Sequence, residues 1–320
     1  MPGNAATTRE ACEKSAARLA HPNAAAAAFC KERPISTLDF QEVATGIFVH
    51  RGAIAEASSD NLGDVSNIAF VIGTNAVAVI DAGGSRAVGE QVYAAIRERT
   101  ELPISTLIMT HMHPDHVLGA APLKEAGADV IGHKDLTRAL LDRSESYLSG
   151  FANLIGNPGF LGTEITLPDR EIDAASEIHL GDRTLTLTPH PTAHTATDLT
   201  VVDGATGTLF AGDLVFQDHA PALDGSLRGW QAVLGQMKQS GATAVVPGHG
   251  GPILAWPDGA EDIARYLEVL AADTRAAIAD GVPLSRASSM IALSEAPHWQ
   301  LFELFNARNA TAAYTELEWE

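Results

Sequence analysis

The sequence predicts an α+β fold in which two β-sheets pack face to face under outer helices, a four-layer αβ/βα sandwich. Paired apolar strands come first and strand–helix units follow, and this order occurs twice along the 320 residues without a sequence repeat. Sheets and helices that each bury one face must be layered against one another. A hydrophobic content of 46% and a charged content of 19% fit a globular chain with a substantial core.

The first half begins with segments rich in Val, Ile and Phe. The stretch "NIAFVIGTNAVAVIDAGG" has turn residues at "GTN" and predicts a β-hairpin of residues 67–73 and 76–81. Helical spacing then begins at Ser85, and a strand in "ISTLIMTH" precedes another helix. The remaining elements expected in this half are a strand over 129–133 and a helix over 133–151.

The second half repeats this order. Alternation in "EIHLGDRTLTLTPH" predicts paired strands, and "DLTVVDGATGTLFAGDLVF" predicts a hairpin with a "DGATG" turn. The elements expected after it are a helix over 225–241, a strand and loop over 244–251, a helix over 261–281, and a tail that is helical first and then irregular. Long loops at 56–66 and 150–168 are expected to be functional or mobile.

Residues 1–35 are expected to form an N-terminal helical hairpin, separate from one large domain over 36–320 that includes the C-terminal helices and tail. Its two predicted helices flank a "HPN" turn, and they carry Cys12 and Cys30, which would face each other at the open end. A disulfide there would imply an oxidising compartment, whereas the alternative is two unrelated core residues. Residues 1–20 lack the apolar segment of a signal peptide, so the chain is either cytosolic or a mature form without its leader.

The formal net charge of −19 excludes several partners. A phosphate backbone or an anionic membrane would be repelled by most of such a surface, so neither is expected to bind. The sequence contains no apolar run of the length needed to span a bilayer, so membrane insertion is not expected. The expected partner is a small-molecule substrate, and a homodimer is left open.

One short stretch, "MTHMHPDHVLGA", crowds four metal-binding side chains directly after an apolar strand. They are His111, His113, Asp115 and His116. Two residues apart on an extended segment, His111 and His113 would point to the same side. Imidazole and carboxylate are ligands that zinc and similar divalent ions prefer.

Three distant polar residues also follow apolar strands. They are His194 in "HPTAHTATD", Asp213 in "LFAGDLVF" and His249 in "VVPGHGG". A lone histidine at a strand end is more often structural, but four coincident segments indicate convergence on one edge of the sandwich. The sequence therefore predicts a metal site at that edge.

The motifs "THMHPDH", "AHT", "GD" and "PGHG", in this order over residues 40–260, resemble the metallo-β-lactamase fold superfamily. The resemblance implies a centre of two Zn²⁺ ions, with Fe or Mn as alternatives. His111, His113 and His194 would hold the first ion, Asp115, His116 and His249 the second, and Asp213 would bridge both. Asp81 in "NAVAVIDAG" would support the metal loop.

A narrower resemblance lies in "HPTAHT", "ALDGSLRGW" and the "ELEWE" terminus. These segments are similar to those of periplasmic zinc metallohydrolases associated with quinoprotein and sulfur-oxidation systems. That branch implies a periplasmic or secreted protein, in agreement with the disulfide, and a cytoplasmic location is the alternative.

The resemblance also implies a reaction. Two zinc ions would lower the pKa of a shared water, and the hydroxide would attack an ester, thioester or lactone carbonyl. Asp115 would be catalytic, because it could orient the nucleophile and pass a proton to the leaving group. The alternatives are amide hydrolysis of β-lactams, an iron-dependent sulfur dioxygenase, and a non-catalytic metal-binding module. True β-lactamases of the superfamily place cysteine or serine where this chain has Asp213, which favours the esterase-like members.

Further polar residues are candidates for the surroundings of the metals. His190 is expected either to orient a ligand or to belong to a turn, and Asp198 could accept a hydrogen bond from a ligand histidine. His219 and His133 are candidates for lining a pocket. Specificity is expected from loops 52–66, 144–166 and 217–229.

Overall fold

The computed structural model of the protein describes residues 37–320. The predicted helical hairpin over 1–35 and its cysteines, Cys12 and Cys30, lie outside the described residues, so both stay predictions. No helix in the described part of the chain combines the length and the apolar character that crossing a membrane requires.

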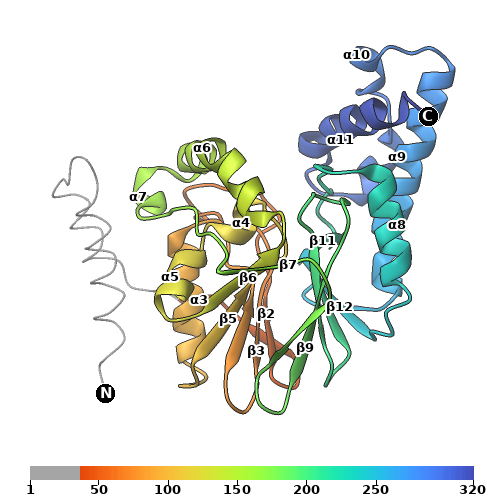
Figure 1. The fold of residues 1–320 in the computed structure, drawn as a ribbon. Helices are drawn as coiled ribbons and strands as arrows, with labels where there is room; N and C mark the ends of the chain where they lie inside the picture. The colour runs from red at the N-terminus through yellow and green to blue at the C-terminus, as the bar shows by residue number, and fades with distance from the viewer. Residues whose placement is uncertain (1–36) are drawn as a thin grey trace.

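Two β-sheets face each other at the centre of the molecule (Figure 1). The seven-stranded sheet has the order β1-β2-β3-β4-β5-β6-β7, antiparallel as far as β4 and parallel from β4 to β7. Its strands are β1 (Gln41–Ala44), β2 (Ile47–His50), β3 (Ile68–Ile72), β4 (Val77–Ile80), β5 (Ile104–Ile108), β6 (Asp129–His133) and β7 (Arg170–Ile172).

The six-stranded sheet has the order β13-β12-β11-β10-β9-β8. Only the pair β11 and β12 is parallel, and the other neighbours are antiparallel. Its strands are β8 (Ser176–His179), β9 (Thr184–Pro189), β10 (Leu199–Asp203), β11 (Thr208–Phe216), β12 (Ala244–His249) and β13 (Leu254–Ala255).

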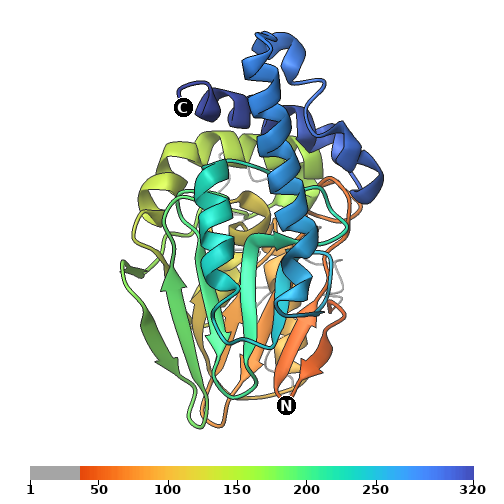
Figure 2. The ribbon, with the colours of Figure 1, turned by 90° about the vertical axis from the view of Figure 1, so that its right-hand side faces the viewer.

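Helices cover the outer faces of both sheets, as the two views in Figures 1 and 2 show. The first half contributes α3 (Arg86–Arg97), α4 (Pro114–Val117), α5 (Ala120–Glu125), α6 (Leu136–Ile155) and α7 (Asn157–Phe160). The second half contributes α8 (Leu227–Met237), η1 (Asp258–Ala260), α9 (Glu261–Ala279), α10 (Leu284–Ala287), η2 (Leu293–His298) and α11 (Phe302–Leu317).

Three apolar clusters hold these layers together. Val71, Leu187 and Phe210 belong to the cluster between the two sheets, where both inner faces are apolar. A second cluster joins the seven-stranded sheet to α3 and α5, and a third joins the other sheet to α8, α9 and α11. The predicted four-layer αβ/βα sandwich is confirmed.

Local sequence signals explain several boundaries. The Oγ of Ser85 accepts a hydrogen bond from the backbone N–H of Val88, so this residue caps α3 as predicted. The hairpin expected over 67–73 and 76–81 is present as β3 and β4.

Two predicted segments differ in the structure. Helix α6 continues to Ile155 and α7 follows it, so much of the expected loop over 150–168 is helical. The C-terminal tail forms the short η2 first and the long α11 afterwards, the reverse of the predicted order. Pro297 interrupts regular helix early in the tail, whereas apolar residues of α11 such as Ala310 and Ala313 are buried against the core.

Candidate metal centre and substrate cavity

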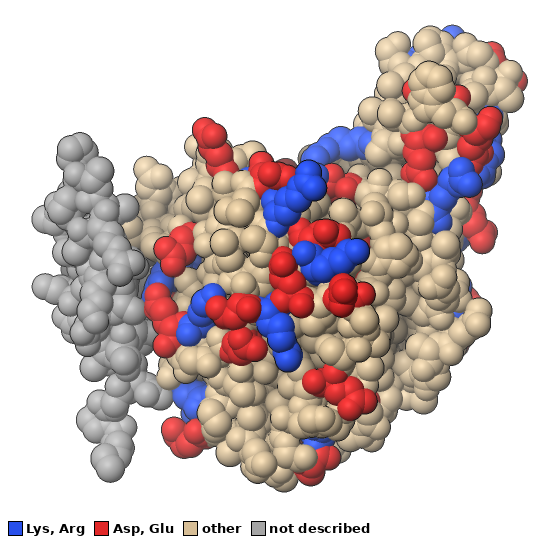
Figure 3. Space-filling view, in the orientation of Figure 1, with Lys and Arg blue, Asp and Glu red and all other residues tan. Residues whose placement is uncertain are grey.

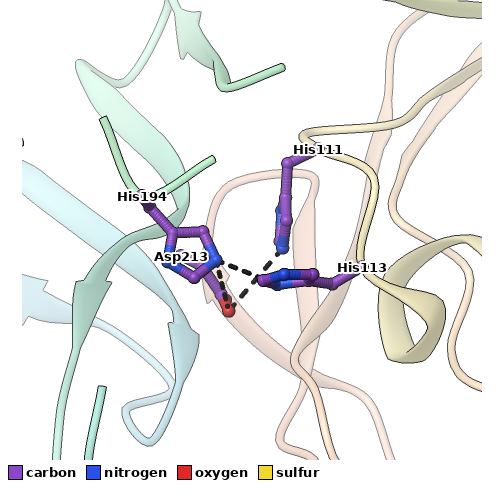
Figure 4. Close-up of side chains that lie close together, drawn as sticks. All are labelled: His111, His113, His194 and Asp213. Carbon is purple, nitrogen blue, oxygen red and sulfur yellow. Dashed lines mark hydrogen bonds and ion pairs between the residues drawn. The ribbon is translucent and has the colours of Figure 1, made fainter. Parts of the chain in front are cut away.

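Seven side chains from distant parts of the chain gather between the two sheets. Ligand atoms of His111, His113, His194 and Asp213 lie within 4.8 Å of one another, and those of Asp115, His116 and His249 form a second group by the same measure. Figure 4 shows the first group, with two histidines reaching from the loop after β5 and the other two residues from the opposite side. These are the seven residues that the sequence singled out as ligands.

The secondary structure explains how these side chains meet. His111 and His113 follow β5, while Asp115 and His116 lie in α4, which begins at Pro114. His194 lies in the loop between β9 and β10, and His249 is the last residue of β12.

Asp213 departs from the predicted position at a strand end, because it lies within the continuous strand β11. The preceding residue, Gly212, has a φ of 51°, and the pairing register between β11 and β12 shifts there. This irregularity turns the Asp213 carboxylate toward the histidines.

The carboxylate of Asp213 lies between the two groups. Its Oδ1 is 3.1 Å from Nε2 of His116, in the second group. Its Oδ2 is 3.7 Å from Nε2 of His111 and 3.4 Å from Nε2 of His194, both in the first. One carboxylate therefore faces both groups, as a bridging ligand must.

The buried polar atoms at the centre fit a metal ion. Among the described residues, Nε2 of His111, Nε2 of His116 and Oδ1 of Asp213 are buried and make no hydrogen bond. Buried polar atoms almost always have a partner, so three converging atoms without one indicate a site built for another ligand. Nitrogen and carboxylate oxygen are ligands that suit zinc.

Hydrogen bonds fix the tautomers of four of the five histidines. In each, Nδ1 donates to an oxygen acceptor and leaves the lone pair of Nε2 directed at the centre. The pairs are His111 with Oγ1 of Thr110 at 3.0 Å, His116 with Asp81 at 2.8 Å, His194 with the carbonyl of Ala222 at 2.6 Å, and His249 with the carbonyl of Val65 at 2.9 Å.

Asp81 supports both groups at once. Its Oδ2 accepts from Nδ1 of His116 and from Oγ1 of Thr110, each at 2.8 Å, and its Oδ1 accepts from the backbone N–H of Thr110. Thr110 in turn accepts from His111. The backbone of Asp81 has a φ of 60°, an uncommon conformation that aspartate tolerates better than most residues. The sequence predicted the supporting role of Asp81 but not the part of Thr110.

The fifth histidine is oriented differently. Nδ1 of His113 faces the centre, 3.0 Å from Nε2 of His194, while Nε2 of His113 donates to Oδ2 of Asp224 at 3.2 Å. Asp224 also accepts two hydrogen bonds from Arg143 on α6, at 2.6 and 3.1 Å. Sequence reasoning missed Asp224 and Arg143, because a lone aspartate in "ALDGS" and an arginine within a helix carry no spacing signal.

Burial and the neighbouring carboxylates shift the pKa values of the histidines at the centre. Burial lowers the pKa of His194 to about 3, so this ring is neutral and can offer a lone pair. Burial also opposes charge on His249, but the carboxylates of Asp213 and Asp115 outweigh it and raise the pKa of that ring to about 9. The two carboxylates therefore draw positive charge into the centre, which is the electrostatic condition for binding divalent cations.

A close backbone approach completes the loop that carries His249. A Cβ atom on Gly248 would collide with Oδ1 of Asp213, so only glycine fits beside that carboxylate. Nδ2 of Asn67 donates to the carbonyls of Pro247 at 2.8 Å and of Gly250 at 2.7 Å, which holds the loop against β3. Neither contact was predicted.

A cavity of about 340 Å³ opens directly onto the centre. Asp115, Asp213, His113 and His249 form part of its floor. The walls come from α6, from the segment 55–57, from the segment after β11, and from α11. Among the residues of these walls are, in the same order, Arg143, Tyr147, Phe151, Leu154, Glu56, His219, Leu223, Phe305 and Arg308. The wall from α11 was not predicted, whereas the three specificity segments expected from the sequence each contribute.

The remaining candidates take different places. His219 lines the cavity as expected, and its ring lies 4.5 Å from that of His249. Asp198 does not accept from a ligand ring: its carboxylate accepts from the N–H and the Oγ1 of Thr195. It therefore shapes the loop that carries His194.

The other two histidines lie apart from the ligand rings. His190 is buried, and its Nε2 pairs with Oγ1 of Thr200 at 2.8 Å, so it has the structural role that was the alternative prediction. His133 is buried at the end of β6, where its Nδ1 accepts from the backbone N–H of Asp135, and it is not among the residues that line the cavity.

Comparison with known proteins places the chain in a family. A sequence model of the metallo-beta-lactamase superfamily matches residues 62–249, which include all seven clustered residues. The chain belongs to this superfamily, whose members are generally hydrolytic metalloenzymes. The narrower periplasmic sulfur-oxidation branch finds no such support, and no curated protein gave a significant sequence match.

Solved structures share the fold at low sequence identity. A metallo-beta-lactamase from Pontibacter korlensis superposes with a TM-score of 0.59 at 19% identity, covering 72% of this chain and 99% of that one. FIM-1 from Pseudomonas aeruginosa in its mono-zinc form gives a TM-score of 0.57 at 20% identity, covering 73% and 97%. A metallo-beta-lactamase from Hirschia baltica gives 0.53 at 18% identity, covering 69% and 93%.

Proposed function

We propose that the protein is a dinuclear zinc hydrolase that cleaves an ester, thioester or lactone. The observation that carries this proposal is the position of Asp213, whose carboxylate lies 3.4 Å from Nε2 of His194 in the first group and 3.1 Å from Nε2 of His116 in the second. A carboxylate between two three-residue groups is the arrangement expected for a pair of metal ions that share a ligand.

The chemistry divides between the metals and the chain. Zinc ions bound here would supply a water of lowered pKa and would polarise the substrate carbonyl. Asp115 is suited to moving a proton, because its carboxylate lines the cavity and lies 3.4 Å from Nε2 of His249. Its side chain is 16% exposed, against 4% for Asp213, so it is the more accessible of the two carboxylates at the floor.

A side-chain hydrogen bond anchors the backbone at Asp115. Oγ of Ser66 donates to its carbonyl at 2.6 Å, which ties α4 to the segment that borders the cavity. The side chain of Asp115 extends from this anchored helix, and its carboxylate can accept a proton from the attacking water and return it to the leaving group. Apolar neighbours in the cavity, such as Phe216 and Leu223, exclude bulk water from this transfer.

Hydrolysis of β-lactams is the second candidate. The similar solved structures are named as β-lactamases, although their likeness to this chain extends to the fold alone at 18–20% identity. The aspartate at position 213 favours hydrolysis of an ester or thioester, because true β-lactamases of the superfamily carry cysteine or serine at this position according to the resemblance. Turnover of a chromogenic cephalosporin would reverse this ranking.

Metal analysis and a substrate panel test the proposal together. The purified chain is stripped with chelator, reloaded with zinc, iron or manganese, and assayed on a thioester, a lactone and a cephalosporin. We expect two zinc ions per chain and chelator-sensitive turnover of the thioester or lactone. Asp115→Asn should abolish most of that turnover, whereas Asp142→Asn on the exposed face of α6 should leave it unchanged. Iron-dependent oxygen uptake, or zinc binding without any turnover, would overturn the proposal.

A further inference from the structure

Two arginines line the cavity, and only one of them is neutralised. Arg143 makes two hydrogen bonds to Asp224, the shorter at 2.6 Å, so its charge is already matched. Arg308 lies on α11, is exposed, and makes no hydrogen bond or ion pair with any residue of the described chain. A free guanidinium therefore stands at the cavity in a protein of net charge −19.

The remaining charges around the cavity leave room for an anion there. Asp115 and Asp213 lie at the floor among the histidines, and Glu56 lies in a different wall segment from Arg308. Figure 3 shows blue and red side chains gathered in front of the notch between the part that carries α6 and the lobe that carries α10 and α11. Metal ions bound at the centre would cancel the negative charge of the floor, so a negative group on the substrate would not be repelled.

Apolar side chains stand beside this arginine. Phe305 precedes Arg308 by one turn on α11, and Phe151 and Leu154 line the cavity from α6. Leu154 is 49% exposed, which is unusual for a large apolar side chain at the wall of a cavity. A ligand that covers Leu154 and Phe305 would bury apolar surface that water now reaches.

We propose that the substrate carries a carboxylate that pairs with Arg308 and an apolar acyl segment that lies against Phe305, Leu154 and Phe151. Arginine binds a carboxylate in a bidentate manner, which fixes the orientation of the scissile carbonyl relative to the metal centre. The superfamily match ends at residue 249, so α11 and Arg308 lie outside the part that carries the shared chemistry. This inference rests on the proposed hydrolase function and narrows its substrate class.

Two pairs of probes test the role of Arg308. The first pair is the hexanoyl thioester of 3-mercaptopropionic acid and the same thioester of 3-mercaptopropionamide, which differ only in the negative charge. The second pair comprises the matching hexyl thioethers, which cannot be hydrolysed and report binding by calorimetry. We expect the zinc-loaded protein to prefer the acid over the amide by about 10- to 100-fold in both measurements, the range of a charge-assisted hydrogen bond.

Variants then assign the preference to one side chain. Arg308→Gln should remove it, mainly through KM, and leave the amide probe unchanged, while Arg308→Lys should keep part of it. Arg286→Gln is the matched control, because it removes an exposed arginine of the neighbouring α10 that does not line the cavity. Equal binding of acid and amide by the unaltered chain, or equal loss on both probes in Arg308→Gln, would overturn the inference. Selective binding of the acid thioether without turnover of either thioester would support Arg308 as the anion site and refute the hydrolase proposal.

Discussion

Nδ1 of His116 donates a hydrogen bond of 2.8 Å to Oδ2 of Asp81, a carboxylate that supports both groups of ligand atoms. The same oxygen of Asp81 accepts from Thr110, whose hydroxyl accepts from His111. A single buried carboxylate thus orients one ligand ring in each group. Its loss should affect both groups of ligand atoms, although Asp81 belongs to neither.

Replacing Asp81 tests this arrangement. Asp81→Asn keeps the shape of the side chain but removes the charge and one acceptor, so His116 and Thr110 can no longer both be satisfied. We expect zinc affinity to fall by about 10- to 100-fold, as measured by competition with a chromogenic chelator. The exposed Asp173→Asn is the control. Unchanged affinity for both ions would show that Asp81 has only a folding role.

Asp213 tests the bridging arrangement itself. Asp213→Asn leaves three ligands in each group but removes the charge that faces both. We expect the metal content to fall from two zinc ions per chain toward one, because the negative charge that faces both groups is lost. Elemental analysis after dialysis measures the stoichiometry, and retention of both ions would argue against a bridge.

Asp224 and Arg143 link a metal ligand to the cavity wall. Arg143→Gln should leave Asp224 with one charged partner fewer, loosen His113, and weaken zinc binding by about tenfold. Arg138→Gln on the same helix is the matched control, because Arg138 is 87% exposed and its one ion pair within residues 37–320 is with the exposed Asp142. Zinc affinity is measured by chelator competition for both variants. Equal affinities would remove Arg143 from the support of the centre.

His50, which is not one of the seven clustered residues, should make the stability of the fold depend on pH. Burial opposes its charge, but the hydrogen bond to Asp64 at 2.9 Å and the charge of that carboxylate raise its pKa above the usual 6.5. The folded chain therefore binds this proton more tightly than the unfolded chain. The stabilisation is fully present below pH 6.5 and is lost as the pH rises through the folded-state pKa.

The measurement compares melting temperatures in chelator, so that metal binding does not contribute. His50→Gln should lose roughly 1.5–3 kcal/mol of stability at pH 6, the scale of a hydrogen bond to a charged group, and less at pH 9. The exposed His179→Gln provides the comparison, because His179 is 66% exposed. If the melting temperatures of the unaltered chain and of His50→Gln differ by the same amount at pH 6 and pH 9, this assignment of the pH dependence to His50 is contradicted.

The sequence predicted the layers and the ligands because both depend on local patterns. Short apolar runs predicted most of the strands, alternation predicted β8 and β9, and each ligand except Asp213 lies at or beyond a strand end. Asp213 was placed wrongly, since nothing in "LFAGDLVF" distinguishes a strand end from a shift in register.

The parts that were missed depend on contacts between distant segments. Asp224 becomes a partner of His113 only when α6 brings Arg143 to the same carboxylate. Asp198 was assigned a ring to orient, yet the carbonyl of Ala222 lies closer to His194 in space and takes that role at 2.6 Å. Such competition between acceptors is decided by tertiary packing.

The two halves of the sandwich contribute different ligands. The segment after β5 supplies four of the seven, and the opposite sheet and its loops supply His194, Asp213 and His249. Ions bound by ligands from both halves would cross-link the two sheets, in addition to the apolar contacts that already join them. Loss of the ions would then lower the rigidity of the fold as well as the activity, because the same ions would serve both.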